Sequence, residues 1–164
     1  MKFIKECIPY IIVILIVVLI RTFIVTPVRV DGASMNPTLN NGDIMLLNKF
    51  DKKYKRFDIV VVNYDGTKLI KRIIGLPGEH IRYLNNKLYI NNKIIKDIEL
   101  DVKTDNFNIK DLNYDIIPED CYFVMGDNRN NSTDSRIIGP INKSDVVGKT
   151  KIVLFPFNRI SIVE

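Results

Sequence analysis

The sequence predicts a mainly β protein: an antiparallel β-sheet or barrel-like domain that follows one N-terminal transmembrane helix. A long uncharged apolar run opens the chain, and short β-rich runs separated by turn residues fill the rest. In that remainder, apolar residues do not repeat at helical spacing for long. The 164 residues, of which 46% are hydrophobic and 26% charged, suffice for one domain with a core. We therefore expect an anchor over residues 1–27 and one β domain over residues 28–164.

The apolar run, CIPYIIVILIVVLI, lies between Glu6 and Arg21. As a helix it reaches only about 21 Å at ~1.5 Å per residue, which is short of a bilayer core. If Arg21 extends its charged end to the interface and TFIVTPV continues the segment to Val28, the reach becomes roughly 33 Å, which is enough to span. Pro27 is then a natural end of the helix.

A cleaved secretory signal is the alternative, because Lys2 and Lys5 give the chain a basic start. No small-x-small cleavage site follows the apolar run, since RTFIVTPVRV is bulky and a cut after Ala33 would put the charged Asp31 two residues upstream. We therefore predict an uncleaved single-pass anchor in the cell membrane. The basic start predicts a cytoplasmic N-terminus and an extracytoplasmic domain, and basic residues on the other flank weaken that bias.

The β domain follows as strand-length runs: DIMLLNKF, DIVVVNYD, TKLIKRII, HIRYL, KLYI, CYFVMGD and KIVLF. The stretch LNNKLYINNK predicts a hairpin, because Asn85, Asn86, Asn91 and Asn92 tolerate the left-handed backbone of tight turns. Residues from about 85 to 117 have mixed charge and few strong runs. They predict a hairpin-like surface insertion without chemistry of its own.

Charge and cysteine content argue against two classes of protein. The formal charge of +5 would permit nucleic-acid binding, but Lys and Arg are scattered among acidic residues rather than gathered in a block, so we expect no nucleic-acid partner. Cys7 and Cys121 lie in different contexts, which disfavours a disulfide and makes no metal motif. His80 with these two cysteines gives little support for a zinc site, so we expect no metal.

Ser34 is a candidate nucleophile, set in DGASMNPTLNNGD directly after the apolar segment. Serine in such a stretch is ordinarily a turn residue. The only histidine, His80, would have to serve a Ser-His-Asp triad, and its position at the start of a strand favours an ordinary surface or half-buried role. If Ser34 is a nucleophile, its base is therefore expected to be another residue type.

Lys71 is the candidate base. In TKLIKRIIG the alternation of a strand puts Leu69, Lys71 and Ile73 on one face. Burial between large aliphatic residues would lower the lysine pKa, and Lys68 and Arg72 would lower it further by like-charge repulsion. The alternative is a strand-edge lysine with its amine in water.

A third polar cluster, MGDNRNNSTDSRIIGP, separates two apolar runs near residues 125–140. Such a stretch is ordinarily a surface loop. Asp134 and Arg136 can pair, however, and Gly126 and Gly139 bracket the segment where the backbone can bend tightly.

Taken together, these blocks resemble the type I signal peptidases, which are membrane-anchored Ser/Lys serine endopeptidases. The resemblance covers nearly the whole chain in order: the anchor, GASMNPTL, GDIMLLNKF, RFDIVVV, KRIIGLPGE, MGDNRNNSTDSRIIGP and VGKTKIVLFPFNRI. Single-anchor members of the Gram-positive kind are most similar in size. The resemblance implies an antiparallel β fold and a hydrolase that processes signal peptides in protein secretion, cutting after small residues as in Ala-x-Ala.

The resemblance also implies roles for single residues. Ser34 matches the nucleophile, Lys71 the general base and Ser132 the serine that holds the lysine amine, while Asp134 and Arg136 match a supporting pair. The family oxyanion hole uses the backbone N–H of the nucleophile, often with a hydroxyl donor two residues earlier, and that position here is Gly32. Residues that match the walls of the substrate pockets are Val28, Val30, Met35, Leu69 and Ile70.

The implied partners are signal peptides of secretory preproteins and the lipid bilayer, and the implied acyl transfer needs no metal or organic cofactor. Two other functions remain open. A self-cleaving repressor of the same Ser/Lys type would carry an N-terminal DNA-binding module where this chain has an anchor. A catalytically silent β domain that binds exported chains would not require Ser34, Lys71 and Ser132 together.

Overall fold

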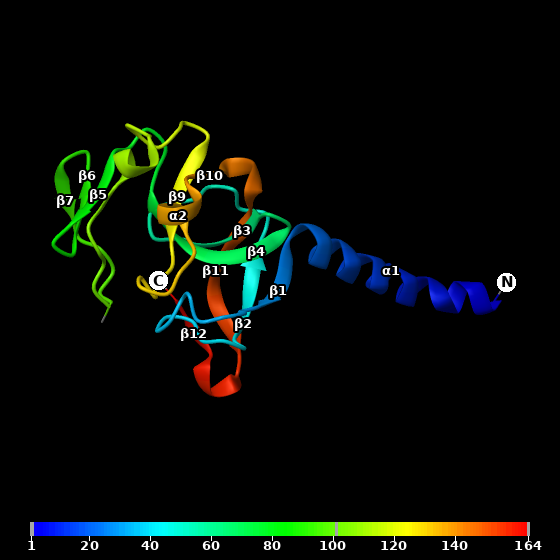
Figure 1. Cartoon of the computed structure of the whole chain (residues 1–164). Coiled ribbons are helices and arrows are strands. Elements are labelled where there is room, and N and C mark those ends of the chain that lie inside the picture. The colour runs from blue at the N-terminus through cyan, green and yellow to red at the C-terminus, as the bar shows by residue number, and fades with distance from the viewer. Residues whose placement is uncertain (1, 101, 164) are drawn as a thin grey trace.

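The structure is a computed structural model that describes residues 2–100 and 102–163. Helix α1 (Lys2–Phe23) is followed by strand β1 (Val25–Arg29), and the helix extends away from the β domain as a separate arm (Figure 1). The amine of Met1, on which the predicted orientation partly depends, lies outside the described residues. Among the helices that could be searched in the described part of the chain, none has the length and apolar character needed to cross a membrane.

The larger sheet is antiparallel throughout and contains eight strands within the described residues. Besides β1 its members are β2 (Ile44–Asn48), β3 (Ile59–Tyr64), β4 (Thr67–Gly75), β9 (Cys121–Met125), β10 (Ile141–Asn142), β11 (Val146–Phe155) and β12 (Ser161–Ile162). The strand order is β1-β2-β11-β3-β4-β9-β10, and β12 pairs with β11. The prediction of a mainly β, antiparallel domain is confirmed.

The helical segment ends earlier than the sequence suggests. The expected continuation to Val28 is replaced by β1, which pairs with β2 from Val25 opposite Asn48 to Arg29 opposite Ile44. Pro27 is tolerated there because β1 is the edge strand, and no further strand pairs with its outer side, where a missing N–H costs no hydrogen bond. The helix therefore passes directly into the sheet that carries the site.

A second sheet lies at the far end of the domain from α1 (Figure 1). It has the order β7-β6-β5-β8 and consists of β5 (Ile81–Leu84), β6 (Lys87–Ile90), β7 (Lys93–Ile95) and β8 (Phe107–Asn108). Both of its tight turns are Asn-Asn pairs with positive φ: 50° and 62° at Asn85 and Asn86, and 49° and 65° at Asn91 and Asn92. The predicted use of asparagine in left-handed turns is confirmed.

This small sheet is more than a solvated extension. Tyr83, Ile109 and Ile117 are buried in one cluster with Phe123 of β9. The sequence expectation of a surface insertion missed this core, because its apolar residues are dispersed among polar ones and are assembled only by the sheet. Short helical turns complete the fold: η1 (Ile109–Leu112), α2 (Ser135–Ile138), η2 (Lys143–Asp145) and η3 (Phe157–Arg159).

Three core clusters meet at β4. Ile74 packs with the small sheet, Ile73 packs with β3 and β9, and Ile70 packs against a third cluster around Met35. Since β4 lies between β3 and β9, its centre is covered by neighbouring strands on both sides. Lys71 lies in that centre.

Candidate active site

Ser34 lies in the turn-rich segment between β1 and β2. Gly32 adopts φ of 93°, a left-handed conformation that favours glycine, and its N–H donates to Asn41 Oδ1 at 3.1 Å. Met35 and Leu39 are buried on the inner side of the segment and anchor it to the third core cluster. The loop thus places the Ser34 hydroxyl at the surface of a rigid core.

Lys71 meets Ser34 directly. Its Nζ donates a hydrogen bond to Ser34 Oγ at 2.7 Å, and the residue is only 3% exposed. Lys71 pairs with Val60 of β3, so its backbone is fixed by the sheet. A neutral amine at the same position could instead accept the hydroxyl proton of Ser34, which is the geometry required of a general base.

Burial is the main cause that lowers the pKa of Lys71 from its ordinary value of 10.5. Asp134 opposes the shift, Arg136 reinforces it, and Asp127 again opposes it. The expected contributions of Lys68 and Arg72 are absent from these causes. Arg72 points to the opposite face of the strand, where an aspartate neutralises it, and Lys68 is exposed to solvent.

Residues 126–134, the clamp segment, follow β9 and hold residues 30–43, the nucleophile loop, in place. Asn128 donates from its backbone N to the Ser34 carbonyl oxygen at 3.0 Å and from its side-chain Nδ2 to the Ala33 carbonyl oxygen at 3.1 Å. Gly126 lies so close that an added Cβ would collide with the Ser34 carbonyl oxygen and with Ser132 Oγ. Glycine is therefore required at position 126 by close approach of two backbones.

Asp134 and Arg136 form the expected pair. Arg136 donates from Nε to Asp134 Oδ1 and from Nη2 to Asp134 Oδ2, both at 2.9 Å. Asp134 is fully buried, caps α2 by accepting from the Arg136 backbone N, and also accepts from Gly126 N at 3.0 Å. The carboxylate thus ties α2 to the end of β9.

Ser132 lies next to Gly126, as the crowding there shows, but its buried Oγ has no hydrogen-bond partner within residues 2–100 and 102–163. The expected bond from Ser132 to the Lys71 amine is not formed in this structure. Lys71 is instead hydrogen-bonded to Ser34.

A second buried ion pair was not foreseen from the sequence. Arg72, which is 1% exposed, donates from Nε and Nη2 to the two carboxylate oxygens of Asp127 at 2.9 and 2.7 Å. Thr38 also donates to Asp127 Oδ2, at 2.5 Å, which connects the nucleophile loop to the same carboxylate. The sequence carried a signal: Arg72 stands between large aliphatic residues on its own strand face, and a charge there requires a partner.

Five residues expected to line substrate pockets border one small cavity. Val28, Val30, Met35, Leu69 and Ile70 lie around a volume of about 80 Å³, together with Ser34 and Lys71. Ligand sites for drug-sized molecules are larger, at roughly 300–1,000 Å³. Charged residues complete its lining: Arg29, Asp31 and Lys68.

The remaining reactive side chains lie elsewhere. His80 contacts Asn108 of the small sheet at 3.1 Å through Nε2, whereas Ser34 is bonded to Lys71. Cys7 and Cys121 are free cysteines in the structure. Burial raises the pKa of the Cys121 thiol to about 11.

Comparisons with known proteins agree with this geometry. A family model described as signal peptidase, peptidase S26, matches residues 3–155. Signal peptidase I of Bacillus amyloliquefaciens is 42% identical over 160 residues, covering 92% of this chain and 86% of that protein. Signal peptidase I P of Bacillus subtilis subsp. natto is 43% identical over 161 residues, with coverage of 91% and 87%. A signal peptidase I crystal structure from Enterococcus faecalis V583 matches with a TM-score of 0.54 at 33% identity, covering 59% of this chain and 96% of that chain.

Similarity of this extent, on a β domain that holds a serine against a buried lysine, defines the class of protein as a serine peptidase, a hydrolase. The chain belongs to the signal peptidase family, peptidase S26, as a type I signal peptidase.

Proposed function

We propose that the protein removes N-terminal signal peptides from exported preproteins, using Ser34 as nucleophile and Lys71 as general base. The observation that carries the proposal is the 2.7 Å contact between Lys71 Nζ and Ser34 Oγ in a chain of this family. A domain that only bound exported chains would have no need for a buried lysine against a serine hydroxyl, since burying an amine is unfavourable.

The reaction is acyl transfer in two steps. Neutral Lys71 takes the proton of Ser34, and the alkoxide attacks the scissile carbonyl carbon to form a tetrahedral oxyanion. Collapse of this intermediate breaks the peptide bond, and the lysine proton passes to the leaving amine. Lys71 then takes a proton from water, whose oxygen attacks the acyl-enzyme ester. The bond between the acyl carbon and Ser34 Oγ breaks, Lys71 returns the proton to Ser34 Oγ, and the signal peptide leaves with a new carboxyl group. No metal or organic cofactor takes part in these steps.

The oxyanion is stabilised by the backbone N–H of Ser34. This N–H donates to no acceptor among the described residues, so it is free to bind a substrate oxygen. Gly32, two residues earlier, offers no hydroxyl. Removal of one oxyanion-hole donor, an asparagine side chain in another serine peptidase, lowers kcat by about 10²–10³.

Specificity for small residues follows from the cavity beside Ser34. Its walls at Val28, Val30, Met35, Leu69 and Ile70 leave about 80 Å³. A methyl side chain fits such a space, whereas a large one meets the walls, so substrates with Ala-x-Ala before the cut are favoured. Asp134 and Arg136 support the lysine without taking part in the chemistry.

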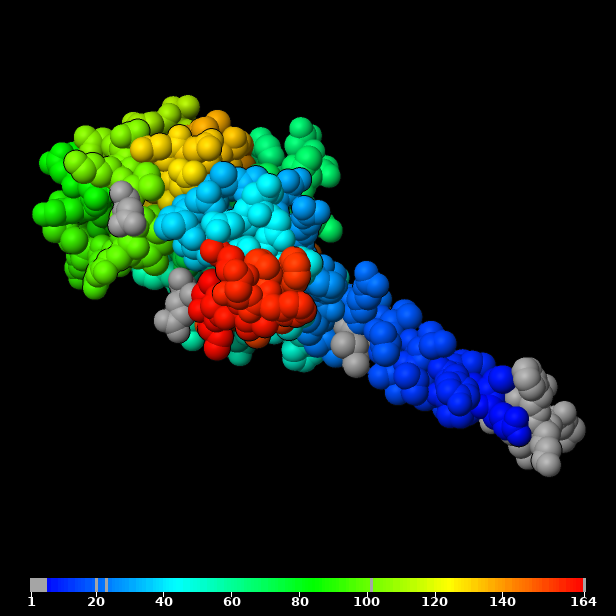
Figure 2. All heavy atoms as spheres, turned by 90° about the horizontal axis from the view of Figure 1, so that it is seen from below, coloured from blue at the N-terminus to red at the C-terminus, as the bar shows by residue number. Residues whose placement is uncertain are grey.

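The protein is held in the cell membrane by α1, with its N-terminus in the cytoplasm and the catalytic domain outside. Every large apolar side chain between Ile8 and Leu19 is exposed, so the helix has an unpartnered apolar surface. Such a surface suits lipid rather than water. The helix protrudes from the β domain as an arm (Figure 2). The helix holds the catalytic domain close to where translocated preproteins emerge, and the substrates are their signal peptides, with no role for nucleic acid.

The direct test is cleavage of a purified preprotein, or of a peptide with an Ala-x-Ala site, by the full chain in detergent. We expect Ser34→Ala to abolish cleavage. Ser144→Ala is the matched control, because Ser144 is an exposed serine in η2 whose hydroxyl donates to Asn142 Oδ1. The Ser144→Ala variant should cut at the wild-type rate. Cleavage by Ser34→Ala at more than a trace level would refute the assignment of the nucleophile.

A further inference from the structure

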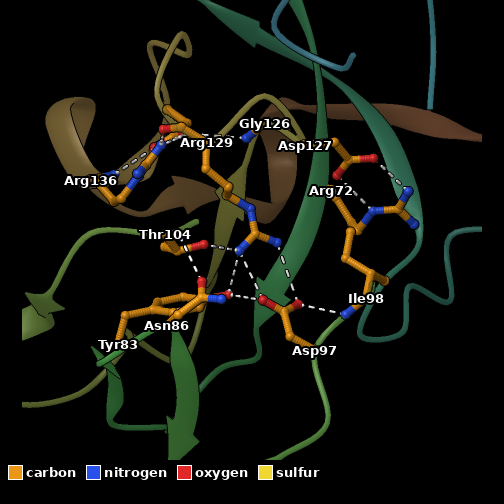
Figure 3. Close-up of polar contacts among 11 residues, drawn as sticks. Arg72, Tyr83, Asn86, Asp97, Ile98, Thr104, Gly126, Asp127, Arg129 and Arg136 are labelled. Carbon is orange, nitrogen blue, oxygen red and sulfur yellow. Dashed lines mark hydrogen bonds and ion pairs between the residues drawn. The ribbon is translucent and has the colours of Figure 1, made fainter. Parts of the chain in front are cut away.

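Arg129 is a buried cation that the proposed chemistry does not use. It follows β9 in the clamp segment, and its side chain is only 1% exposed. Its guanidinium reaches the small sheet and the connection between β7 and β8, where Nη1 lies 2.9 Å from Tyr83 Oη, 2.8 Å from Asp97 Oδ2 and 2.8 Å from Thr104 Oγ1 (Figure 3). A cation so deeply buried costs stability unless it is paired, so the partners define its position closely.

The partners of Arg129 form a network of their own. Tyr83 donates from its hydroxyl to Asp97 Oδ2 at 2.6 Å, and its ring lies 5.4 Å from the Arg129 guanidinium carbon. Thr104 is fixed by its backbone N, which donates to Asn86 Oδ1 at 2.7 Å in the first Asn-Asn turn. Three separate parts of the small sheet and its connections therefore converge on one guanidinium.

The backbone of Arg129 leads to the active site. Its carbonyl oxygen accepts from Arg136 Nη2 at 2.6 Å, and the same Nη2 donates to Asp134. Asp134 and Arg136 are the two charged groups with the largest effects on Lys71, and Asp127, paired with Arg72, is the third. Arg129 thus lies between the small sheet and the charges that face Lys71.

We propose that Arg129 is a positioning residue, through which the small sheet holds Asp134 and Arg136 in place behind Lys71 and keeps water away from its amine. The inference rests on the proposed function of Lys71. A cavity of about 310 Å³ borders Arg129, Ser132 and Arg136. If Arg129 lost its partners, the segment would loosen and water from this cavity would reach the lysine.

The consequence is a shift in pH dependence rather than a loss of substrate binding. Burial is what chiefly lowers the pKa of Lys71, so added water raises that pKa toward its ordinary value. The acid limb of kcat should move to higher pH, and a shift of about one unit lowers kcat roughly tenfold on that limb. KM should stay within about twofold, because the cavity walls come from β1, β4 and the nucleophile loop and not from the clamp segment.

The experiment measures kcat and KM against pH for an Ala-x-Ala peptide, with melting temperatures, in full-length Arg129→Lys and Tyr83→Phe. Lysine keeps the charge but is shorter and lacks the planar guanidinium, so it cannot reproduce the contacts of Arg129, and phenylalanine keeps the buried ring but removes one acceptor of Arg129. Arg82→Met is the control: Arg82 stands next to Tyr83 on β5 but stacks on Tyr89, outside the network. It should keep the wild-type profile.

We expect both network variants to shift the acid limb upward with KM nearly unchanged. If Arg129→Lys does not fold, Tyr83→Phe decides the matter alone. A folded variant that melts earlier but keeps the wild-type acid limb would show that Arg129 is merely structural and would overturn the inference. A wild-type enzyme with no acid limb would overturn the role of Lys71 and this inference with it, which distinguishes the two failures.

Discussion

Lys71 is a basic side chain placed where a charged amine is unfavourable. At 3% exposure it lies between Ile70 and Arg72 in a strand covered on both sides, and burial lowers its pKa. A lower pKa makes the neutral amine, which is the form that can act as a base, more accessible. Asp134 and Arg136 act on this pKa in opposite directions, since the carboxylate raises it and the guanidinium lowers it.

Asp134→Ala tests whether the supporting pair acts through structure. The substitution leaves Arg136 without its partner and leaves the Gly126 N–H without its acceptor, and losing one partner of a buried ion pair costs about 3–5 kcal/mol. We expect a lower melting temperature together with lower activity. Asp134→Asn is the matched variant, because it keeps an oxygen for the cap and should lose less stability. Normal melting without activity in Asp134→Ala would point to a direct catalytic role.

The sequence identified Lys71 as a candidate base but did not predict the buried ion pairs near it. The alternation of TKLIKRIIG shows that a lysine shares a face with Leu69 and Ile73, but only the resemblance to the signal peptidases favoured a buried base over a strand-edge lysine. The Arg72–Asp127 and Arg129–Asp97 pairs join residues far apart in the chain, and only the order of the strands brings them together. Ser132 was expected to bond the lysine, and the structure leaves its hydroxyl without a partner among the described residues.

The elements whose conformation is set by local residue preferences could be predicted from the sequence. The Asn-Asn turns of the small sheet follow from the tolerance of asparagine for positive φ, and both form where the sequence places them. The end of α1 did not follow, because Val25–Arg29 is apolar enough to extend a helix and becomes a strand only by pairing with β2. The cluster shared by Tyr83, Ile117 and Phe123 was also missed, since contacts between distant segments decide it.

The whole molecule is a β domain on an apolar arm. A stretch of exposed aliphatic side chains from Ile8 to Leu19 is far larger than the apolar patches of a water-facing surface. Helix α1 leads directly into β1, and Ser34 lies in the loop that follows β1. The nucleophile is therefore close to the end of α1 along the chain. In the proposed function, α1 would hold this site close to a membrane-bound substrate.

Topology can be tested at this scale by protease shaving of spheroplasts that produce the full chain. We expect the protease to digest residues 28–164 from outside, because the basic N-terminus favours the cytoplasm. A cytoplasmic protein in the same cells should stay intact, and lysed cells should lose both. Protection of the β domain in intact spheroplasts would reverse the proposed orientation.

The central claim is that Ser34 and Lys71 form one catalytic unit, and the pH dependence of kcat/KM in Lys71→Arg tests it most directly. Because the neutral amine is the active form, wild-type activity should rise with pH as Lys71 loses its proton and should disappear at mildly acid pH. Arginine cannot lose its charge, so Lys71→Arg should be as inactive as Ser34→Ala, and the double variant scarcely worse than either. If Lys71→Arg kept substantial activity, or kept the wild-type acid limb, another group such as His80 would have to be the base.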